Sequence, residues 1–182
     1  MLRIATFALR GFLLLFGAVV LGVSVTVAKH QAIGMPPSET SFGSFCGAFG
    51  ILISLIGFGA LFFDKIPALV LMAADGLATA FYLAGAIALT LALKSVPSCT
   101  SKDDYNVAQR YLNKLLNGGC DYVQNKQPYC PNGYDDNELS SLCQRVQADY
   151  VFQYLAFIFG VAIIGMSFFL NRSGKGRSAA YV

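Results

Sequence analysis

Three polar side chains interrupt one long apolar stretch of the sequence, 67–93, at spacings that place them on one helical face. Asp75, Thr79 and Tyr82 stand at i, i+4 and i+7, positions that align on one side of an α-helix. An acid at the centre of a membrane helix costs about 2.5–3.5 kcal/mol, so such acids are usually kept for a function. We expect Asp75 either to be a structural acid, bonded to Thr79, Ser54 or the backbone, or to contact a lipid headgroup, an ion or a proton.

Four cysteines gather in the one large polar segment, 95–149. An even set of cysteines in one loop is typical of two disulfides in an exported segment. Three pairings exist, and we favour Cys99–Cys143, which ties the ends of the loop together, with Cys120–Cys130 closing a smaller inner loop. The segment has no histidine and no C-x-x-C pair, so we expect no metal there.

The remaining reactive residues form no catalytic constellation. The single histidine, His30, lies in a short polar loop, and the fifth cysteine, Cys46, lies in an apolar run as a small packing residue. A quinone-using membrane oxidoreductase would need closely spaced redox cysteines, and no cysteine pair here has that spacing. We therefore expect a protein that is not an enzyme and holds no cofactor, although bound lipids such as sterol or sphingolipid would fit its surroundings.

The composition predicts the elements that position these groups. Hydrophobic residues make up 55% of the 182 residues and charged residues 13%, against about 25% charged in soluble domains. The net charge of +3 and the lack of a basic run exclude a nucleic-acid partner. We expect an all-α integral membrane protein with one domain, 1–182, whose four transmembrane helices form a bundle. The apolar runs that predict these helices are 7–28, 42–63, 67–93 and 150–170.

Basic residues near the short ends predict the orientation. The first run is longer than the apolar part of a signal peptide, so we expect an uncleaved helix with Arg10 near its start. Apart from Asp75, we expect no ionisable group in the helix cores. Both termini, including the tail 171–182, are expected in the cytosol and the segment 95–149 outside. The basic residues on the expected cytosolic side are Arg3, Arg10, Lys65, Arg172, Lys175 and Arg177.

Small residues at helical spacing indicate close helix packing in two of the runs. Either seam could face a helix of the same bundle or a neighbouring protomer, and their abundance leads us to expect a homo-oligomer or a lateral array. The seams consist of Gly43, Gly47, Gly50 and Gly57 in the second run, and of Gly76, Ala80, Ala84 and Ala88 in the third.

Short motifs in three of the runs and in the loop carry a resemblance to a known family. They are 45–50 (FCGAFG), Asp75, Ser98-Cys99 and 143–148 (CQRVQA). They resemble the MARVEL-domain tetraspan proteins of fungi, the non-classical export protein family of the eisosome compartment. The resemblance implies a MARVEL-like fold and a non-enzymatic role in organising plasma-membrane domains and in sensing sphingolipid or sterol. The chain departs from that family in its additional cysteine pair and its short tail.

We therefore expect a multi-pass plasma-membrane protein that assembles laterally and shapes or sorts lipid microdomains. Its partners would be membrane lipids, other copies of the chain and membrane-organising proteins. The alternative is a channel or transporter subunit in which Asp75, Thr79 and Tyr82 line a polar path. A transport path normally needs several ionisable groups, so we favour the first interpretation.

Overall fold

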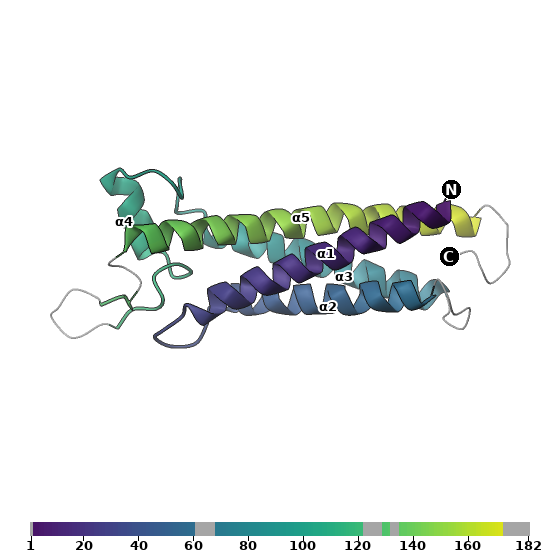
Figure 1. Cartoon of the computed structure of the whole chain (residues 1–182), viewed down its shortest axis with the longest axis horizontal. Coiled ribbons are helices and arrows are strands. Elements are labelled where there is room, and N and C mark those ends of the chain that lie inside the picture. The colour runs from purple at the N-terminus through teal and green to yellow at the C-terminus, as the bar shows by residue number, and fades with distance from the viewer. Residues whose placement is uncertain (1, 61–67, 122–128, 132–134, 173–182) are drawn as a thin grey trace.

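Four long helices and one short helix make up the chain, as seen in a computed structural model that describes residues 2–60, 68–121, 129–131 and 135–172. Each of the four long helices is long and apolar enough to cross a membrane. They lie side by side along the length of the molecule (Figure 1). The helices are α1 (Leu2–Lys29), α2 (Ser38–Ala60), α3 (Ala68–Ala92), the short α4 (Asp104–Leu112) and α5 (Asp136–Arg172).

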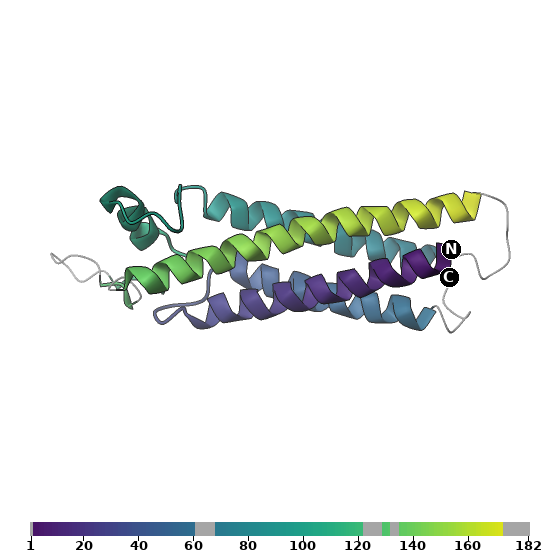
Figure 2. The ribbon, with the colours of Figure 1, turned by 45° about the horizontal axis from the view of Figure 1, so that its top comes forward.

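The four long helices form a closed ring of neighbours. α1 packs against α2 and α5, and α3 packs against the same two helices from the other side. Successive long helices run in opposite directions, so the start of α1 and the end of α5 lie at one end of the bundle (Figures 1 and 2). α4 lies at the opposite end, beyond the start of α5 (Figure 1). The expected four-helix bundle is therefore the fold of this chain.

The last helix extends well beyond the expected span 150–170. α5 starts at Asp136 and runs without interruption to Arg172, because its first turns have an amphipathic pattern that an apolar run does not reveal. Leu139, Leu142 and Val146 lie three and four residues apart and are buried.

Besides the hydrophobic core among the long helices, which includes Leu13 and Ile163, another core lies at the end of the bundle that carries α4. It joins the last turns of α3, the segment after α4 and the first turns of α5, and it includes Leu93, Leu116 and Leu142. The disulfide Cys99–Cys143 lies in this core, and a second disulfide joins Cys120 to Cys130. These are the two pairings that the sequence favoured.

Hydrogen bonds connect the two loops at this end. The backbone amides of Ala32 and Ile33 donate to the carbonyl of Gly118 at 2.8 and 3.0 Å. Gly119 has a φ of +84°, and a Cβ there would lie 2.1 Å from the Ile33 carbonyl oxygen, so only glycine fits. Lys114 also pairs with Glu39 of α2 at 2.6 Å. The turn at 64–66 with Lys65 and the tail from 173 with Lys175 and Arg177 lie outside the described residues.

Candidate functional site

An ion pair lies inside the bundle. The Arg10 guanidinium of α1 donates to both carboxylate oxygens of Asp75 on α3, at 3.2 and 2.8 Å. The two side chains are 1% and 4% exposed, so the pair is shielded from surrounding lipid. Buried charges persist when they are paired with this bidentate geometry. The expectation that Asp75 is the only ionisable group in the helix cores was therefore wrong. From the sequence alone, Arg10 is only a signal for orientation.

Glycine in α2 makes room for the guanidinium. A Cβ at Gly57 would lie 1.9 Å from Nη1 of Arg10 and 2.0 Å from its Cζ, so the side chain lies directly against the α2 backbone. Three helices therefore meet at this pair: α1 supplies the cation, α3 supplies the anion, and α2 supplies the space.

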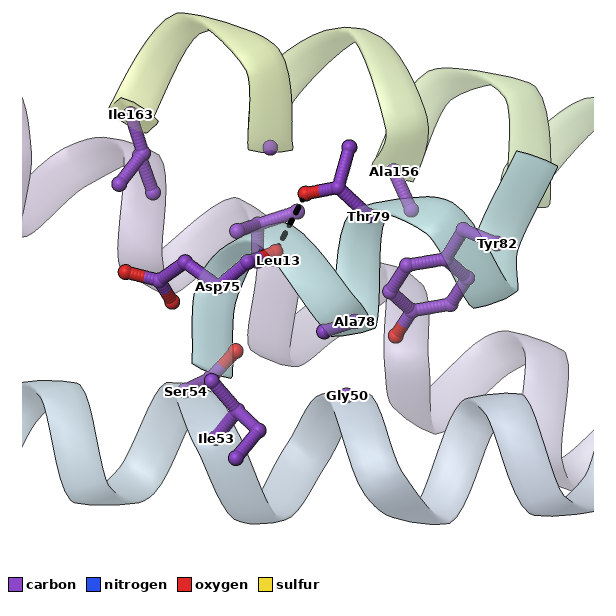
Figure 3. Close-up of a pocket in the computed structure, with 11 residues that line it drawn as sticks. Leu13, Gly50, Ile53, Ser54, Asp75, Ala78, Thr79, Tyr82, Ala156 and Ile163 are labelled. Atoms are coloured by element: carbon purple, nitrogen blue, oxygen red, sulfur yellow. Dashed lines mark hydrogen bonds between the residues drawn. The ribbon is translucent and has the colours of Figure 1, made fainter. Parts of the chain in front are cut away.

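One expectation was that Thr79 bonds to the carboxylate of Asp75. The hydrogen bond of Thr79 goes elsewhere. Its hydroxyl donates to the backbone carbonyl of Asp75 one turn earlier, at 2.7 Å (Figure 3). The same hydroxyl oxygen would lie 2.2 Å from a Cβ at Gly160. Thr79 therefore packs against the backbone of α5, as Arg10 packs against that of α2.

Tyr82 fills a niche between two glycines. Its side chain is 2% exposed, and its hydroxyl would lie 1.7 Å from a Cβ at Gly50 and 2.9 Å from one at Gly17. Figure 3 shows the hydroxyl directed toward α2. Among the described residues this hydroxyl has no hydrogen-bond partner. Tyr82 therefore contributes mainly through the packing of its ring.

The three predicted polar residues do line one cavity, but it is very small. Asp75, Thr79 and Tyr82 border it together with Ser54 of α2 (Figure 3). Its volume is about 10 Å³, which is at the lower limit for a cavity that holds a single water molecule. A cavity of this size is not a conduction path. Within the described part of the bundle these side chains form a packed polar layer.

A second polar layer lies nearer the α4 end of the bundle. The Ser24 hydroxyl of α1 donates to Asp149 of α5, and Gln153, one turn further along α5, donates to the other carboxylate oxygen at 3.0 Å. All three residues are buried. A Cβ at Gly43 of α2 would lie 2.3 Å from Oγ of Ser24, and one at Gly85 of α3 would lie 2.1 Å from Oε1 of Gln153.

This second layer is not among the sites that the sequence predicts. The sequence places Asp149 at the end of the polar segment 95–149, because the apolar run 150–170 begins only after it. The available signal was the i, i+4 spacing of Asp149 and Gln153, which places them on one helical face. Because α5 already begins at Asp136, both residues are helical and their spacing does place them on one face.

The glycine seam of α2 lies inside the bundle. Gly43, Gly47, Gly50 and Gly57 are all buried, and a Cβ at Gly47 would lie 2.5 Å from the backbone nitrogen of Leu21 on α1. Close contact between these two helices therefore depends on the seam, as small-residue motifs allow in membranes.

The small-residue seam of α3 has the opposite orientation. Ala80 and Ala84 are exposed and Ala88 is half-buried, and a Cβ at Gly76 would meet no atom within 4 Å. The face defined by these four residues is called the α3 face below. Its middle part, Ala80 and Ala84, points away from the other helices of the same bundle.

No group of three or more His, Cys, Asp or Glu residues that could hold a metal ion occurs in the part of the chain that the structure describes. The two polar layers are instead made of one ion pair and one carboxylate with hydrogen-bond donors. Both layers join helices to each other.

Comparison with known proteins places the chain in a family. The model of the MARVEL family, described as a membrane-associating domain, matches residues 3–166. This match spans α2, α3 and the loop between α3 and α5, together with nearly all of α1 and most of α5. Searches of curated proteins and of solved structures found no match. The match confirms the resemblance at the level of the MARVEL domain, and the chain belongs to the MARVEL family of membrane-associating proteins.

Proposed function

We propose that this chain is a non-enzymatic organiser of the plasma membrane that assembles laterally through the α3 face and gathers particular lipids around itself. The observation that carries the proposal is the contrast between the two seams. The glycines of the α2 seam are buried in contacts inside the bundle, whereas Ala80 and Ala84 of the α3 face are exposed on its exterior.

The physical basis is the weak driving force for helix association in lipid. An apolar side chain gains little free energy when it exchanges contact with lipid for contact with another helix, because both surroundings are apolar. Helices in a membrane therefore associate where small residues allow close van der Waals contact. Gly76, Ala80, Ala84 and Ala88 repeat every four residues over about three turns. A second copy presenting the same face would form a self-complementary contact.

The bundle itself would act as a rigid unit in such an array. The Arg10–Asp75 pair joins α1 to α3, and the Asp149 layer joins α1 to α5. Both termini would be cytosolic and the disulfide-linked loop would be outside. By its resemblance to the fungal non-classical export proteins, the array would form eisosome-like domains in sphingolipid- or sterol-rich membrane, with membrane-organising proteins as further partners.

Counting subunits in lipid vesicles by single-molecule photobleaching tests the assembly. We expect wild-type protein to form oligomers, and Ala80→Leu combined with Ala84→Leu to shift the distribution toward monomers, because two bulky side chains prevent close approach. Ala48→Leu is the matched control, since Ala48 is an exposed alanine of α2. Wild-type protein that is monomeric at high protein-to-lipid ratio would refute lateral assembly.

A further inference from the structure

A groove on the outside of the bundle combines an apolar floor with a cation at one end. It lies between α1 and α5, has a volume of about 500 Å³, and is lined by Ala18, Val19, Gly22, Val23, Thr26 and Arg145. We propose that this groove binds one phospholipid, with its phosphate on Arg145 and an acyl chain along α1. The proposal deepens the lipid-gathering part of the proposed function and rests on it.

The hydrogen bonds of the second polar layer show at which level of the membrane the groove lies. Ser24 of α1 bonds to Asp149 of α5, so these two residues lie at one level of two antiparallel helices. Arg145 lies four residues, or about 6 Å, from Asp149 toward the α4 end. The same step along α1 leads from Ser24 to Ala28, next to the end of α1 at Lys29. Arg145 therefore stands where the membrane span ends, at the depth of lipid headgroups.

The rest of the groove lies at the depth of the acyl chains. Ala18 to Thr26 covers about 12 Å along α1, within the apolar span Ile4–Lys29. A Cβ at Gly22 would meet no atom within 4 Å, and Ala18 is exposed. A groove on the outside of a membrane helix at this depth faces lipid, so hydrocarbon is its natural occupant.

The charge of Arg145 selects the headgroup. Arg145 is exposed, and it forms no hydrogen bond or ion pair with any described residue. The nearest acids on α5 are already engaged, because Asp149 is bonded to Ser24 and Gln153 and Glu138 lies 3.9 Å from His30. A guanidinium binds the oxygens of a phosphate through two parallel hydrogen bonds, and the phosphodiester of a phospholipid lies at this depth.

A second groove shows what this one adds. It lies between α3 and α5 at the other end of the bundle, with a volume of about 530 Å³, and Leu69, Met72, Ala73, Val161, Ile164, Gly165 and Phe168 line it. Among the described residues, no charged side chain borders it, so its described lining offers no ligand for a lipid headgroup. Within the described part of the bundle, the two grooves therefore form a matched pair with and without a headgroup ligand.

Native mass spectrometry of the full chain in detergent tests the site, with dioleoylphosphatidylcholine and dioleoylglycerol as probes. These lipids share their acyl chains, and only the first carries a phosphate. We expect Arg145→Gln to weaken phosphatidylcholine binding about tenfold, as loss of a charged hydrogen-bonded contact predicts. Diacylglycerol binding should be unchanged, and Arg145→Lys should retain part of the phosphate preference.

Two glycine variants test the groove itself. Gly22→Leu should fill it and weaken both lipids, whereas Gly165→Leu in the second groove should leave phosphatidylcholine binding at the wild-type value. Both glycines have no atom within 4 Å of an added Cβ, so both variants should fold, which an unchanged thermal midpoint would verify.

Three results would overturn the phospholipid site: full phosphatidylcholine binding by Arg145→Gln, equal loss of both lipids in that variant, or equal effects of Gly22→Leu and Gly165→Leu. The same spectra report the number of subunits. Absence of oligomers together with a retained phosphate preference would count against lateral assembly alone.

Discussion

Arg10 and Asp75, 65 residues apart in the chain, form a two-bond ion pair that links α1 to α3 inside the bundle. A buried pair of this kind is asymmetric in its energetics. Its formation returns little more than the desolvation of the two charges costs, but removal of one partner leaves the other charge buried and alone. The pair therefore contributes more to the register of the helices than to the net stability.

Replacing one member of this pair should be more damaging than replacing both. We expect Asp75→Ala to lower the free energy of unfolding by about 3–5 kcal/mol. The double variant with Arg10→Met should recover a large part of that loss. Unfolding by SDS titration in mixed micelles would measure the stability of the wild type, the two single variants and the double variant, which together form a double-mutant cycle. Asp104→Ala, at an exposed acid in α4, is the control and should change stability by less than about 1 kcal/mol. Additive losses in the double variant would contradict a direct pair.

The glycine beneath the guanidinium offers a sharper test. Gly57→Ala should destabilise by about 1–3 kcal/mol, because its Cβ would overlap Arg10. Gly59→Ala is the matched control two residues away, with no atom within 4 Å of its added Cβ. It should be neutral or stabilising, since alanine favours the helix by up to about 1 kcal/mol. In an Arg10→Ala background the two substitutions should behave alike. Equal effects in the wild-type background would refute the contact between Gly57 and Arg10.

Tyr82→Phe should leave the stability unchanged or raise it slightly. Its hydroxyl is buried with no hydrogen-bond partner among the described residues, so removing it relieves a desolvation penalty and breaks no bond. Gly50→Ala, which places a methyl group against that hydroxyl, should destabilise in the wild type and less in Tyr82→Phe. A loss of more than about 1 kcal/mol in Tyr82→Phe would show that the hydroxyl donates a bond.

The short helix α4, in the loop between α3 and α5, should lose its protection from hydrogen exchange in acid. Hydrogen bonds from the Ser101 hydroxyl and from Asn106 lower the pKa of Asp103, the N-cap of α4, to about 2. Because the folded pKa lies below the unfolded value of about 3.9, the stabilisation is present above that value. It is lost as the pH falls toward 2. Amide hydrogen exchange of Asn106 and Val107 between pH 5 and 2 would follow this loss.

The matched variant for the acid effect is Asp103→Asn. Asparagine is an equally good N-cap residue but does not titrate in this range. We expect its α4 amides to exchange with much less dependence on pH, once the intrinsic exchange rate is taken into account. Identical pH profiles for the two proteins would rule out Asp103 as the titrating group.

The four membrane helices and both disulfides could be predicted from the sequence, and the interior of the bundle could not. Long apolar runs are sufficient to place helices in a bilayer, and Cys99 and Cys143 stand at the two ends of one loop. Arg10, by contrast, is an ordinary topology signal until its neighbours are known. Arg10 is buried because α2 turns Gly57 toward α1. A single sequence does not determine how each helix is rotated about its axis.

The two seams illustrate the same limit of pattern reasoning. Gly47 and Ala84 both belong to series of small residues at helical spacing, yet the first contacts α1 and the second points outward. Asp149 was hidden for a different reason. The helix that carries it begins with an amphipathic segment, and only the later apolar part of α5 resembles a membrane span.

The distance along the chain between Arg10 and Asp75 has a consequence for biosynthesis. Asp75 lies 65 residues after Arg10, and a stretch of this length takes roughly 3–13 s to synthesise at ribosomal rates of about 5–20 residues per second. During that interval Arg10 has been synthesised, and its partner Asp75 does not yet exist. Arg10 lies about two turns from the start of α1, so its side chain can extend to the interface in the meantime. The bundle can close only after α3 enters the bilayer, and nascent chains that end before Asp75 would present an unpaired charge to membrane quality control.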